Sequence, residues 1–344
     1  MARTVRPTAF GTPEVLETVP TPVPRPAAGE VVVRVRAAGV NPIDWKLYSG
    51  AFHAVDDRHK DSAGVAGALP RLGLECAGVV TKVGPDVGPD TDADVGADVG
   101  AGVDDEAGAG ANGVRVGDEV IVYPVTGAYA DYVTAPVTSL IPKPAGLGWY
   151  EAGALMLAGT TAAHALDVTG VGPGDTVLVH GGSGGVGLMA VQLAVALGAT
   201  VIATAAERNH GLLRGLGALP VSYGAGLLDR VRAAAPDGIT AAIDCVGTDE
   251  ALDTSVASVA DRQRIASITG TDRRVTAGIK IIGNGPGQDA GADIRAAARA
   301  GLAAGAGKGE LRVLIASVFP LSEAARAHRA GAAGHAPGKL VLVP

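Results

Sequence analysis

The stretch 176–194, TVLVHGGSGGVGLMAVQLA, decides the fold of this chain. An apolar strand runs directly into a glycine-rich turn, and an apolar helix follows. In the turn, Gly182, Gly184 and Gly187 have the spacing G-x-G-x-x-G. The first glycine permits a tight turn, the second lets the backbone approach a pyrophosphate, and the third lets the helix pack closely on the strand. Because a helix N-terminus offers free N–H groups, the stretch predicts a dinucleotide-binding site.

Strands and helices alternate after this stretch. The residue pattern predicts strands over 200–204, 239–244 and 264–268, and helices over 210–216 and 251–258. An Ala-rich segment over 150–168 comes before the stretch and predicts a helix or a pair of helices. This alternation is typical of a doubly wound parallel sheet, so we assign residues 146–286 to the Rossmann domain of an α/β protein.

The residues on either side of this domain follow a different pattern. Short extended segments predict a β-rich domain over residues 1–145, with strands in 30–36, 72–83, 116–122 and 127–133. The tail, residues 287–344, predicts helices near 290–305 and 322–332 and strands near 312–317 and 339–343. We expect this tail to rejoin the N-terminal domain.

The composition excludes several classes of protein. Hydrophobic residues make up 47% and charged residues 18% of the 344, which is the balance of a globular chain. There is no run of about 18 apolar residues that would span a membrane, and Met1–Phe10 lacks the apolar core of a secretory signal. We therefore expect a cytoplasmic protein. Two cysteines, Cys76 and Cys245, are too few for a disulfide framework or a four-cysteine zinc site.

The net charge of −7 comes from a single segment. Residues 84–113 are a low-complexity run of Gly, Asp, Ala and Val, and the part 86–106 holds eight of the 35 acidic residues. The other 27 acidic residues are balanced by 28 basic ones. No basic surface is therefore predicted that would bind nucleic acid or an anionic membrane. We expect 84–113 to form an exposed loop.

The end of the next strand indicates which dinucleotide is bound. NAD sites usually carry an acidic residue there, which binds the ribose hydroxyls. Here the strand ends with Thr204 and Ala205, and the first acidic residue is Glu207, followed by Arg208. A missing carboxylate beside a guanidinium favours a 2′-phosphate, so we predict NADP(H). Glu207 still lies within reach of a ribose, which keeps NAD(H) open as the alternative.

Further segments, in order along nearly the whole chain, carry a resemblance to a known family. They read AGVNPIDWK (38–46), GLECAGVV (73–80), VGDEV (116–120), GAYADY (127–132), LAGTTA (157–162), DCVG (244–247) and GHAPGKLVL (334–342). With the glycine-rich turn, they resemble zinc-independent quinone oxidoreductases of the medium-chain dehydrogenase/reductase superfamily. The resemblance implies a GroES-like β-barrel catalytic domain beside the Rossmann domain, an active site in the cleft between them, NADPH as hydride donor and a homodimer.

The resemblance also implies a difference from zinc-dependent relatives, which hold the metal with Cys, His or Glu, and Cys. The corresponding places in this chain are Asn41, the pair Leu74–Glu75 and, approximately, Ala158. A single glutamate cannot build a tetrahedral site, so no metal is expected. Without zinc to stabilise an alkoxide, we expect hydride transfer to a quinone or to the β-carbon of an α,β-unsaturated carbonyl. The oxyanion that forms there needs only hydrogen-bond donors.

Three residues are the catalytic candidates. Asn41 is expected to hydrogen-bond the cofactor or the substrate carbonyl, and Lys46 or Tyr48 to donate to the developing enolate or quinol oxygen. The expected cofactor site comprises Asn41, Thr161, Gly182, Ser183, Gly184, Gly185, Val186, Gly187, Thr204, Ala205, Arg208, Tyr223, Cys245, Val246, Ile268 and Thr269.

Two other functions stay open on the sequence. Polyketide enoyl reductase domains share the glycine-rich motif, so the chain is alternatively a tailoring enoyl reductase of a biosynthetic pathway. A protein that binds NADPH without turnover, as a sensor or a structural protein, would carry the same motif. Turnover with a quinone or an enone separates these functions.

Overall fold

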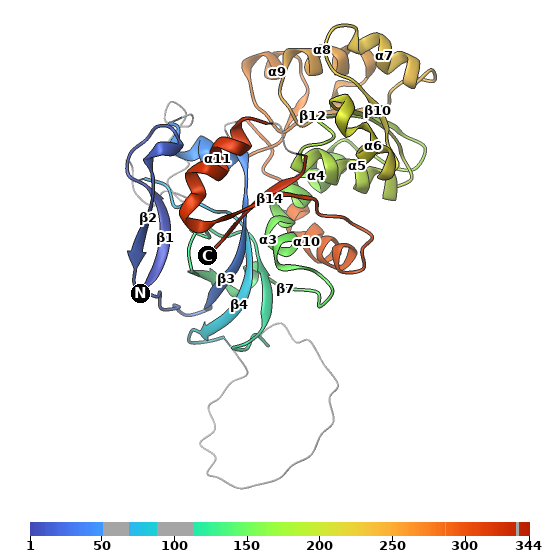
Figure 1. Ribbon diagram of the computed structural model, residues 1–344. Helices are drawn as coiled ribbons and strands as arrows, with labels where there is room; N and C mark the ends of the chain where they lie inside the picture. Colours follow the sequence, from blue (N-terminus) through green and yellow to red (C-terminus); the bar gives the residue numbers. More distant parts are fainter. Residues whose placement is uncertain (51–68, 88–112, 286, 335–336) are drawn as a thin grey trace, which may run out of the picture.

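The computed structural model describes residues 1–50, 69–87, 113–285, 287–334 and 337–344. Residues 88–112, most of the expected acidic loop, therefore lie outside the described residues. Two β-sheets organise the chain, and helices lie around and between them (Figure 1). One sheet is parallel and the other mainly antiparallel, which confirms the α/β class.

The parallel sheet has six strands in the order β10-β9-β8-β11-β12-β13. Their bounds are β8 (Thr176–His180), β9 (Thr200–Thr204), β10 (Leu219–Val221), β11 (Ala241–Asp244), β12 (Ile265–Ser267) and β13 (Lys280–Ile281). In chain order this is 3-2-1-4-5-6, the order of a Rossmann sheet, so the doubly wound prediction is confirmed. The strand order reverses between β8 and β11, and the loops that follow these two strands open a crevice there.

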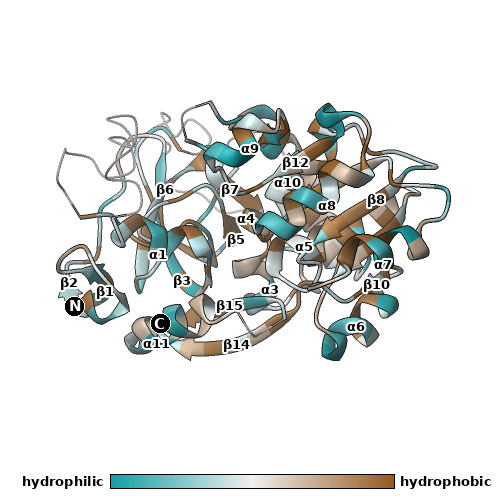
Figure 2. Cartoon of the chain, turned by 90° about the horizontal axis from the view of Figure 1, so that it is seen from above, coloured by the Kyte–Doolittle hydropathy of each residue, from teal (hydrophilic) through white to brown (hydrophobic). Residues whose placement is uncertain are grey.

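Helices cover both faces of this sheet. Val177 and Val179 of β8 face a core with α4 (Met156–Val168), α5 (Gly185–Ala196) and α6 (His210–Gly215). Leu178 faces the opposite core, with α7 (Leu227–Ala234) and α8 (Asp249–Ser258). A strand buried on both faces must be continuously apolar, and Figure 2 shows β8 in hydrophobic colours. The helix α9 (Asp272–Thr276) precedes β13, and α10 (Ala292–Gly307) packs on α4.

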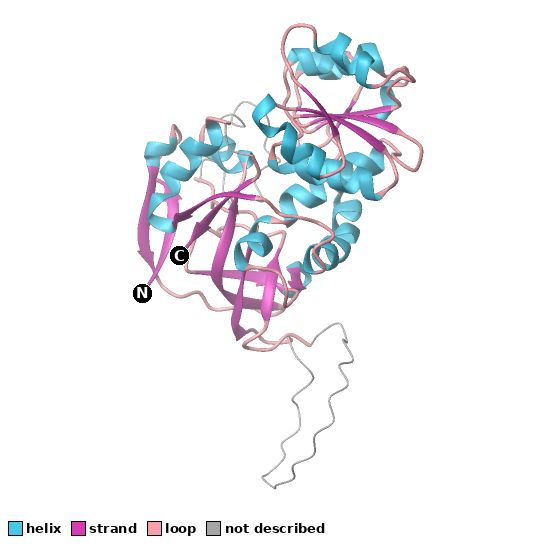
Figure 3. Cartoon of the chain, turned by 45° about the vertical axis from the view of Figure 1, so that its right-hand side comes forward, coloured by secondary structure: helices cyan, strands magenta, loops and turns pink. Residues whose placement is uncertain are grey.

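The second sheet combines strands from residues 30–142 with two strands from residues 315–343, near the C-terminus (Figure 3). Its order is β14-β15-β3-β4-β5-β7, with β6 also paired to β3. The bounds are β3 (Glu30–Val40), β4 (Cys76–Val83), β5 (Glu119–Val122), β6 (Tyr132–Pro136), β7 (Leu140–Pro142), β14 (Ile315–Pro320) and β15 (Lys339–Val343). A separate pair, β1 (Ala2–Pro7) and β2 (Leu16–Thr21), lies beside it. Since β15 pairs with β3, the last strand lies next to the segment that leads into Asn41.

One apolar core continues from sheet to sheet. The helix α3 (Trp149–Ala154) contributes Ala152 and Ala154, which share this core with Ala37 of β3 and Val177 of β8. The short helix α1 (Pro42–Tyr48) follows β3, and α11 (Ala324–Ala332) precedes β15. The shared core thus fixes the position of the two sheets relative to one another.

The strand over 200–204 and the strand over 339–343 have the expected bounds, and most other elements differ by one to three residues at an end. Among the elements that have no counterpart in the expectations, four lie in the Rossmann domain: β10, α7, α9 and β13. They are brief and follow glycine- or alanine-rich stretches, where hydrophobic periodicity is weak.

Candidate active site

A cavity of about 1240 Å³ lies between the two sheets. The antiparallel side supplies the residues around α1, Leu74 before β4 and the segment that follows β5, and the parallel side supplies the loops that follow β8, β11 and β12. Most of the expected site residues line it: Asn41, Lys46, Thr161, Gly184, Gly185, Val186, Gly187, Cys245, Val246, Ile268 and Thr269. The position matches the crevice that the reversal of strand order creates.

The glycine-rich turn leaves room for an anionic group at the N-terminus of α5. A Cβ on Gly182 would lie 2.8 Å from the Cβ of Ala203, and one on Gly187 would lie 2.1 Å from the carbonyl oxygen of Gly181. Both glycines are therefore needed for packing inside the protein. A Cβ on Gly184 would meet its nearest neighbour at 3.4 Å and otherwise project into open space. That open space lies at the N-terminus of α5, where backbone N–H groups favour an anion.

The remaining cofactor candidates lie at the neighbouring strand ends. The N–H of Gly182 donates to the carbonyl oxygen of Thr204, and Asn209 Nδ2 donates to Ser183 Oγ at 3.1 Å, which ties the turn to the end of β9. Ala205 is buried beside them, whereas Arg208 is exposed in the turn that follows. Tyr223 is 59% exposed just after β10. These residues lie outside the lining of the cavity, along the edge that continues from the glycine-rich turn.

A buried carboxylate fixes the loop after β11. Asp244 Oδ1 accepts from the N–H groups of Val246 and Gly247 at 3.0 and 2.8 Å. Its Oδ2 accepts from Arg274 Nη2 at 2.8 Å and from Ser267 Oγ at 2.9 Å. Asp244 and Arg274 are each 1% exposed. The cavity wall at Val246 thus depends on an ion pair that the sequence analysis did not identify.

The two cysteines are unsuited to nucleophilic chemistry. Burial raises the pKa of the Cys245 thiol far above its usual range, and it does the same for Cys76. Cys245 forms part of the cavity wall. His180, at the end of β8, is also buried, and burial lowers the pKa of its imidazole to about 4, so this side chain is neutral near pH 7.

Asn41 lies in a polar cluster on the antiparallel side of the cavity. Asn41 Nδ2 donates to Glu75 Oε1 at 2.9 Å, and the backbone N–H of Leu157 donates to Glu75 Oε2 at 2.8 Å. Lys339 Nζ donates to Glu75 Oε1 at 2.9 Å and also to Asn41 Oδ1. All three side chains are almost completely buried. Lys339 and Glu75 were not among the expected site residues, although both stand in segments that carry the family resemblance.

This donor set does not fit a zinc ion. Both oxygens of Glu75 already accept hydrogen bonds, one of them from a cationic ammonium. The other two expected places hold an amide, Asn41, and a side chain without donor atoms, Ala158. Within the described ranges, no group of three or more His, Cys, Asp or Glu side chains is placed to hold a metal. We therefore derive no step through a metal.

The structure separates the two candidates that follow Asn41. Lys46 is exposed and lines the cavity. Tyr48 is fully buried on the other side of α1, and its hydroxyl lies 2.8 Å from His328 Nδ1. Residues two apart on a helix point in nearly opposite directions. The expectation that Tyr48 donates to the substrate is therefore corrected, because its hydroxyl does not reach the cavity.

Tyr48 instead belongs to a buried network behind α1. His328 Nε2 lies 3.3 Å from the hydroxyl of Tyr129, which donates to Asp44 Oδ2 at 2.8 Å. Asp44 also accepts from the N–H groups of Asn41 and Gly73, and it completes a capping box with Asn41 at the start of α1. Burial lowers the pKa of His328 to about 4, and burial raises the pKa of the Asp44 carboxyl to about 6. The network holds the helix that carries Lys46.

Thr161 does not stand alone in the cavity wall. Its Oγ1 accepts from Arg295 Nη1 at 3.1 Å, and Arg295 Nε lies 3.3 Å from His164 Nδ1. Arg295 also lines the cavity. Burial lowers the pKa of His164, which lies 3.3 Å from Asp289. Arg295 lies in α10, 134 residues from Thr161, so the sequence alone did not indicate this contact.

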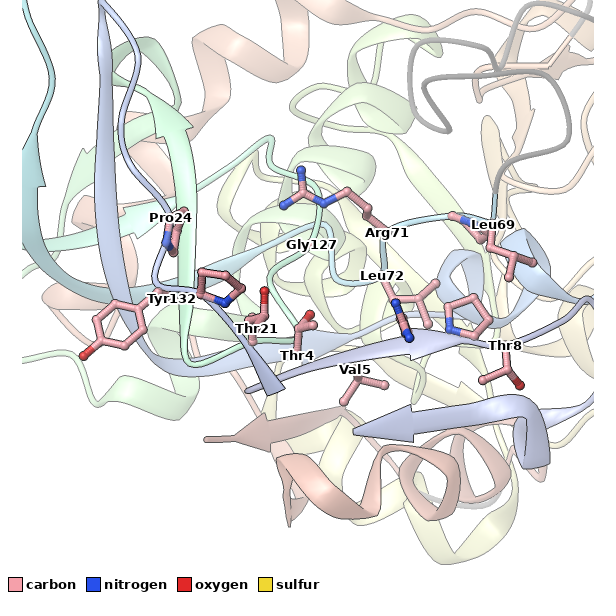
Figure 4. Close-up of a pocket in the computed structure, with 15 residues that line it drawn as sticks. Thr4, Val5, Thr8, Thr21, Pro24, Leu69, Arg71, Leu72, Gly127 and Tyr132 are labelled. Atoms are coloured by element: carbon pink, nitrogen blue, oxygen red, sulfur yellow. The ribbon is translucent and has the colours of Figure 1, made fainter. Parts of the chain in front are cut away.

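A second cavity of about 670 Å³ lies beside β1 (Figure 4). Threonines, prolines and apolar side chains form most of its wall, and Arg6 and Arg71 are the charged residues that line it. It shares no residue with the glycine-rich turn. None of the expected site residues lies there, so we place the active site in the larger cavity.

Comparisons with known proteins agree with this arrangement. Two family models match: the alcohol dehydrogenase GroES-like domain over residues 27–145, and the zinc-binding dehydrogenase domain over residues 216–342. The quinone oxidoreductase of Coxiella burnetii is similar over 100% of this chain and 99% of its own, with 31% identity and a TM-score of 0.77. A mycobacterial protein solved in complex with NADPH is 29% identical, with a TM-score of 0.78, and both chains are covered completely.

Curated sequences add a different kind of relative. The phthioceranic/hydroxyphthioceranic acid synthase of Mycobacterium tuberculosis is 34% identical over 194 residues, which are 56% of this chain and 8% of that protein. The chain spans about half the length, or less, of the first curated relatives that it matches.

A GroES-like domain, a Rossmann sheet and a cavity between them define a two-domain oxidoreductase. The chain belongs to the quinone oxidoreductase-like family of the medium-chain dehydrogenase/reductase superfamily. Among its described helices, none is both long and apolar enough to cross a membrane.

Proposed function

We propose that the chain is an NADPH-dependent reductase that transfers a hydride to a quinone or to the β-carbon of an α,β-unsaturated carbonyl compound. The supporting observation is the cavity in which the glycine-rich turn faces Asn41 and Lys46. When bound, NADPH supplies the hydride. The residues of the chain bind and orient the reactants and stabilise the charge that develops on the acceptor oxygen.

Residues in different parts of the site are proposed to bind different parts of the reactants. The turn from Gly182 to Gly187 binds the pyrophosphate, and Thr204, Arg208 and Tyr223 hold the adenosine end. The loops at Cys245–Val246 and Ile268–Thr269 form the wall beside the reacting ring. Asn41 and Lys46 lie across the cavity, and Lys46 supplies a hydrogen-bond donor there. This reaction requires no metal ion, and both carboxylate oxygens of Glu75 already accept hydrogen bonds.

The proposed function is tested by following NADPH oxidation at 340 nm, with an ortho-quinone and a medium-chain 2-alkenal as parallel acceptors and with NADH in place of NADPH as the control. We expect oxidation of NADPH with at least one acceptor and a preference for NADPH over NADH. Product analysis then distinguishes a quinol from a saturated aldehyde. Tight NADPH binding with no turnover of either acceptor would contradict the proposal and favour a sensor.

Replacement of Arg208 by alanine tests the cofactor preference. If its guanidinium binds the 2′-phosphate, R208A should raise the KM for NADPH roughly tenfold, the loss typical of one charge-assisted contact, and leave the KM for NADH unchanged. Steady-state kinetics with both cofactors measures this. R214A is the matched control, because Arg214 is also an exposed arginine and lies nearby in α6. Equal effects on both cofactors would rule out a specific contact with the phosphate.

A second candidate function rests on the match to the synthase. That match covers 56% of this chain. The alternative function is therefore that of a tailoring enoyl reductase, whose acceptors would be thioester-bound acyl groups. An enoyl thioester of N-acetylcysteamine, added to the same assay, tests this alternative. A kcat/KM for this thioester far above those for the quinone and the alkenal would favour it.

We also propose a homodimer, on the family resemblance, and a location in the cytoplasm, which is the expectation from the sequence. Size-exclusion chromatography with light scattering tests the first part. A mass twice that of the chain would support a homodimer, and a monomer mass across a wide concentration range would contradict it.

A further inference from the structure

Lys339 is a cation of the cavity wall that is held in place from several sides. Its side chain is 5% exposed and lies against α5, since a Cβ on Gly185 would be 2.9 Å from Lys339 Cδ. The preceding residue, Gly338, donates its N–H to the carbonyl oxygen of Ser183. The ammonium group of Lys339 therefore lies between the glycine-rich turn and Asn41.

The hydrogen bonds of this ammonium leave one N–H for a ligand. An ammonium group has three donors and no acceptor. In the part of the chain that the structure describes, two acceptors bond to it, Glu75 Oε1 and Asn41 Oδ1. Lys339 lines the cavity, and its third N–H has no acceptor among the described residues, so it is available to a reactant bound there.

The same contacts fix the polarity of the Asn41 amide. Its Nδ2 donates to Glu75 and its Oδ1 accepts from Lys339. The opposite orientation would point the amide N–H₂ at an ammonium and the amide oxygen at a carboxylate, so it is excluded. Asn41 is thus occupied by the cluster, and it serves to orient the ammonium more than to bind the substrate. Among the nearby donors, Lys46 lies on an exposed helix face and is less constrained.

We propose that Lys339, oriented by Glu75 and Asn41, is the residue that hydrogen-bonds the acceptor oxygen and stabilises the oxyanion formed by hydride transfer. This inference rests on the proposed function, because an oxyanion forms only if the acceptor is a quinone or an enone. Glu75 and Asn41 are then positioning residues. A fixed cation fills the role that a metal ion fills at a polarised carbonyl.

The chemistry balances with groups that are named here. The hydride adds with its electron pair to the β-carbon of an enone or to one carbonyl oxygen of a quinone. The π electrons of the conjugated system move onto the remaining carbonyl oxygen, which becomes an enolate or a quinolate. Lys339 donates a hydrogen bond to that oxygen and then a proton, which leaves a neutral amine. Water in the open cavity returns a proton to the amine. The enol formed from an enone tautomerises to the saturated carbonyl after release.

A cofactor-free titration tests Lys339 apart from turnover. 4-Nitrophenol is a small mimic of the oxyanion, and its absorbance near 400 nm reports the phenolate form. We expect the wild-type protein to bind the phenolate, and K339M/E75Q to bind it at least roughly tenfold more weakly, the loss expected for one charge-assisted hydrogen bond. The double variant is preferred over K339M because it leaves no uncompensated buried carboxylate. K308M, at an exposed lysine at the end of α10, is the matched control.

The kinetic test separates acceptor activation from cofactor binding. With whichever acceptor the wild type reduces, K339M/E75Q should lower kcat about 100-fold, while the Kd for NADPH, measured by fluorescence, stays within a fewfold. Circular dichroism melting shows that the variant is folded. E75Q alone should lower kcat less, because the ammonium remains but is less well oriented.

The outcomes distinguish this inference from the proposed function. Unchanged phenolate binding and unchanged kcat in K339M/E75Q would overturn the role of Lys339 and leave the proposed function intact. A variant that loses NADPH binding but keeps phenolate binding would make Lys339 a cofactor contact and also overturn the inference. Failure of the wild type to bind phenolate would overturn it as well. Lysine-dependent phenolate binding without any turnover would support the oxyanion site and contradict the proposed function.

Discussion

Replacing Arg274 with methionine should destabilise the folded chain by about 3–5 kcal/mol, the usual effect of removing one partner of a buried ion pair. Arg274 Nη2 lies 2.8 Å from Asp244 Oδ2, and both side chains are 1% exposed. Without the guanidinium, a carboxylate remains in an apolar interior with its charge uncompensated. Urea denaturation followed by circular dichroism measures the change in the free energy of unfolding.

The same substitution should weaken NADPH binding beyond what stability explains. Asp244 holds the N–H groups of Val246 and Gly247, so a displaced carboxylate loosens the loop that lines the cavity. R273M is the matched control, because the neighbouring Arg273 pairs with Asp249 and Asp253 at the surface. This substitution should leave the midpoint of urea denaturation almost unchanged. D244N/R274M should recover part of the lost stability. Equal destabilisation by R273M and R274M would contradict the buried-pair explanation.

The sequence predicts those parts of the molecule that are encoded locally. The strand, turn and helix of 176–194 are contiguous, and Gly182 and Gly187 have packing reasons that agree with the motif. The alternation of strands and helices likewise predicted a doubly wound parallel sheet, which the structure confirms. These features were predicted because neighbouring residues determine them.

The residues that the sequence did not identify are held by distant partners. Lys339 is 298 residues from Asn41 and 264 from Glu75, and no local pattern shows that the last strand pairs with the one that precedes Asn41. Arg274 and Arg295 likewise reach the site from helices whose own sequences are unremarkable surface patterns. For Tyr48 a usable signal did exist, since a helix that presents Lys46 to the cavity turns Tyr48 away.

Alanine at Gly184 should weaken NADPH binding, whereas alanine at Gly187 should lower the stability of the fold, although the two glycines share one motif. G187A puts a Cβ 2.1 Å from the carbonyl oxygen of Gly181, which is backbone and cannot move aside, so we expect a loss of about 3 kcal/mol or more in stability. G184A meets nothing closer than 3.4 Å, and the backbone at Gly184 (φ −77°, ψ 170°) suits alanine. It should fold normally and bind NADPH roughly 10–100-fold more weakly, because its methyl group occupies the space proposed for the pyrophosphate.

Thermal melting without cofactor and NADPH titration by fluorescence separate the two effects. G211A is the matched control: Gly211 lies in α6 with open space around it, so alanine there should leave NADPH affinity unchanged and stabilise the helix slightly. If G184A bound NADPH as tightly as the wild type, the pyrophosphate would not approach this turn and the cofactor site would have to be placed elsewhere. If G187A instead kept its stability, the turn would have shifted to relieve the clash. The change in NADPH affinity of G187A would then show how strongly this shift of the turn affects cofactor binding. The pair therefore distinguishes the glycine that builds the turn from the glycine that leaves room for the ligand.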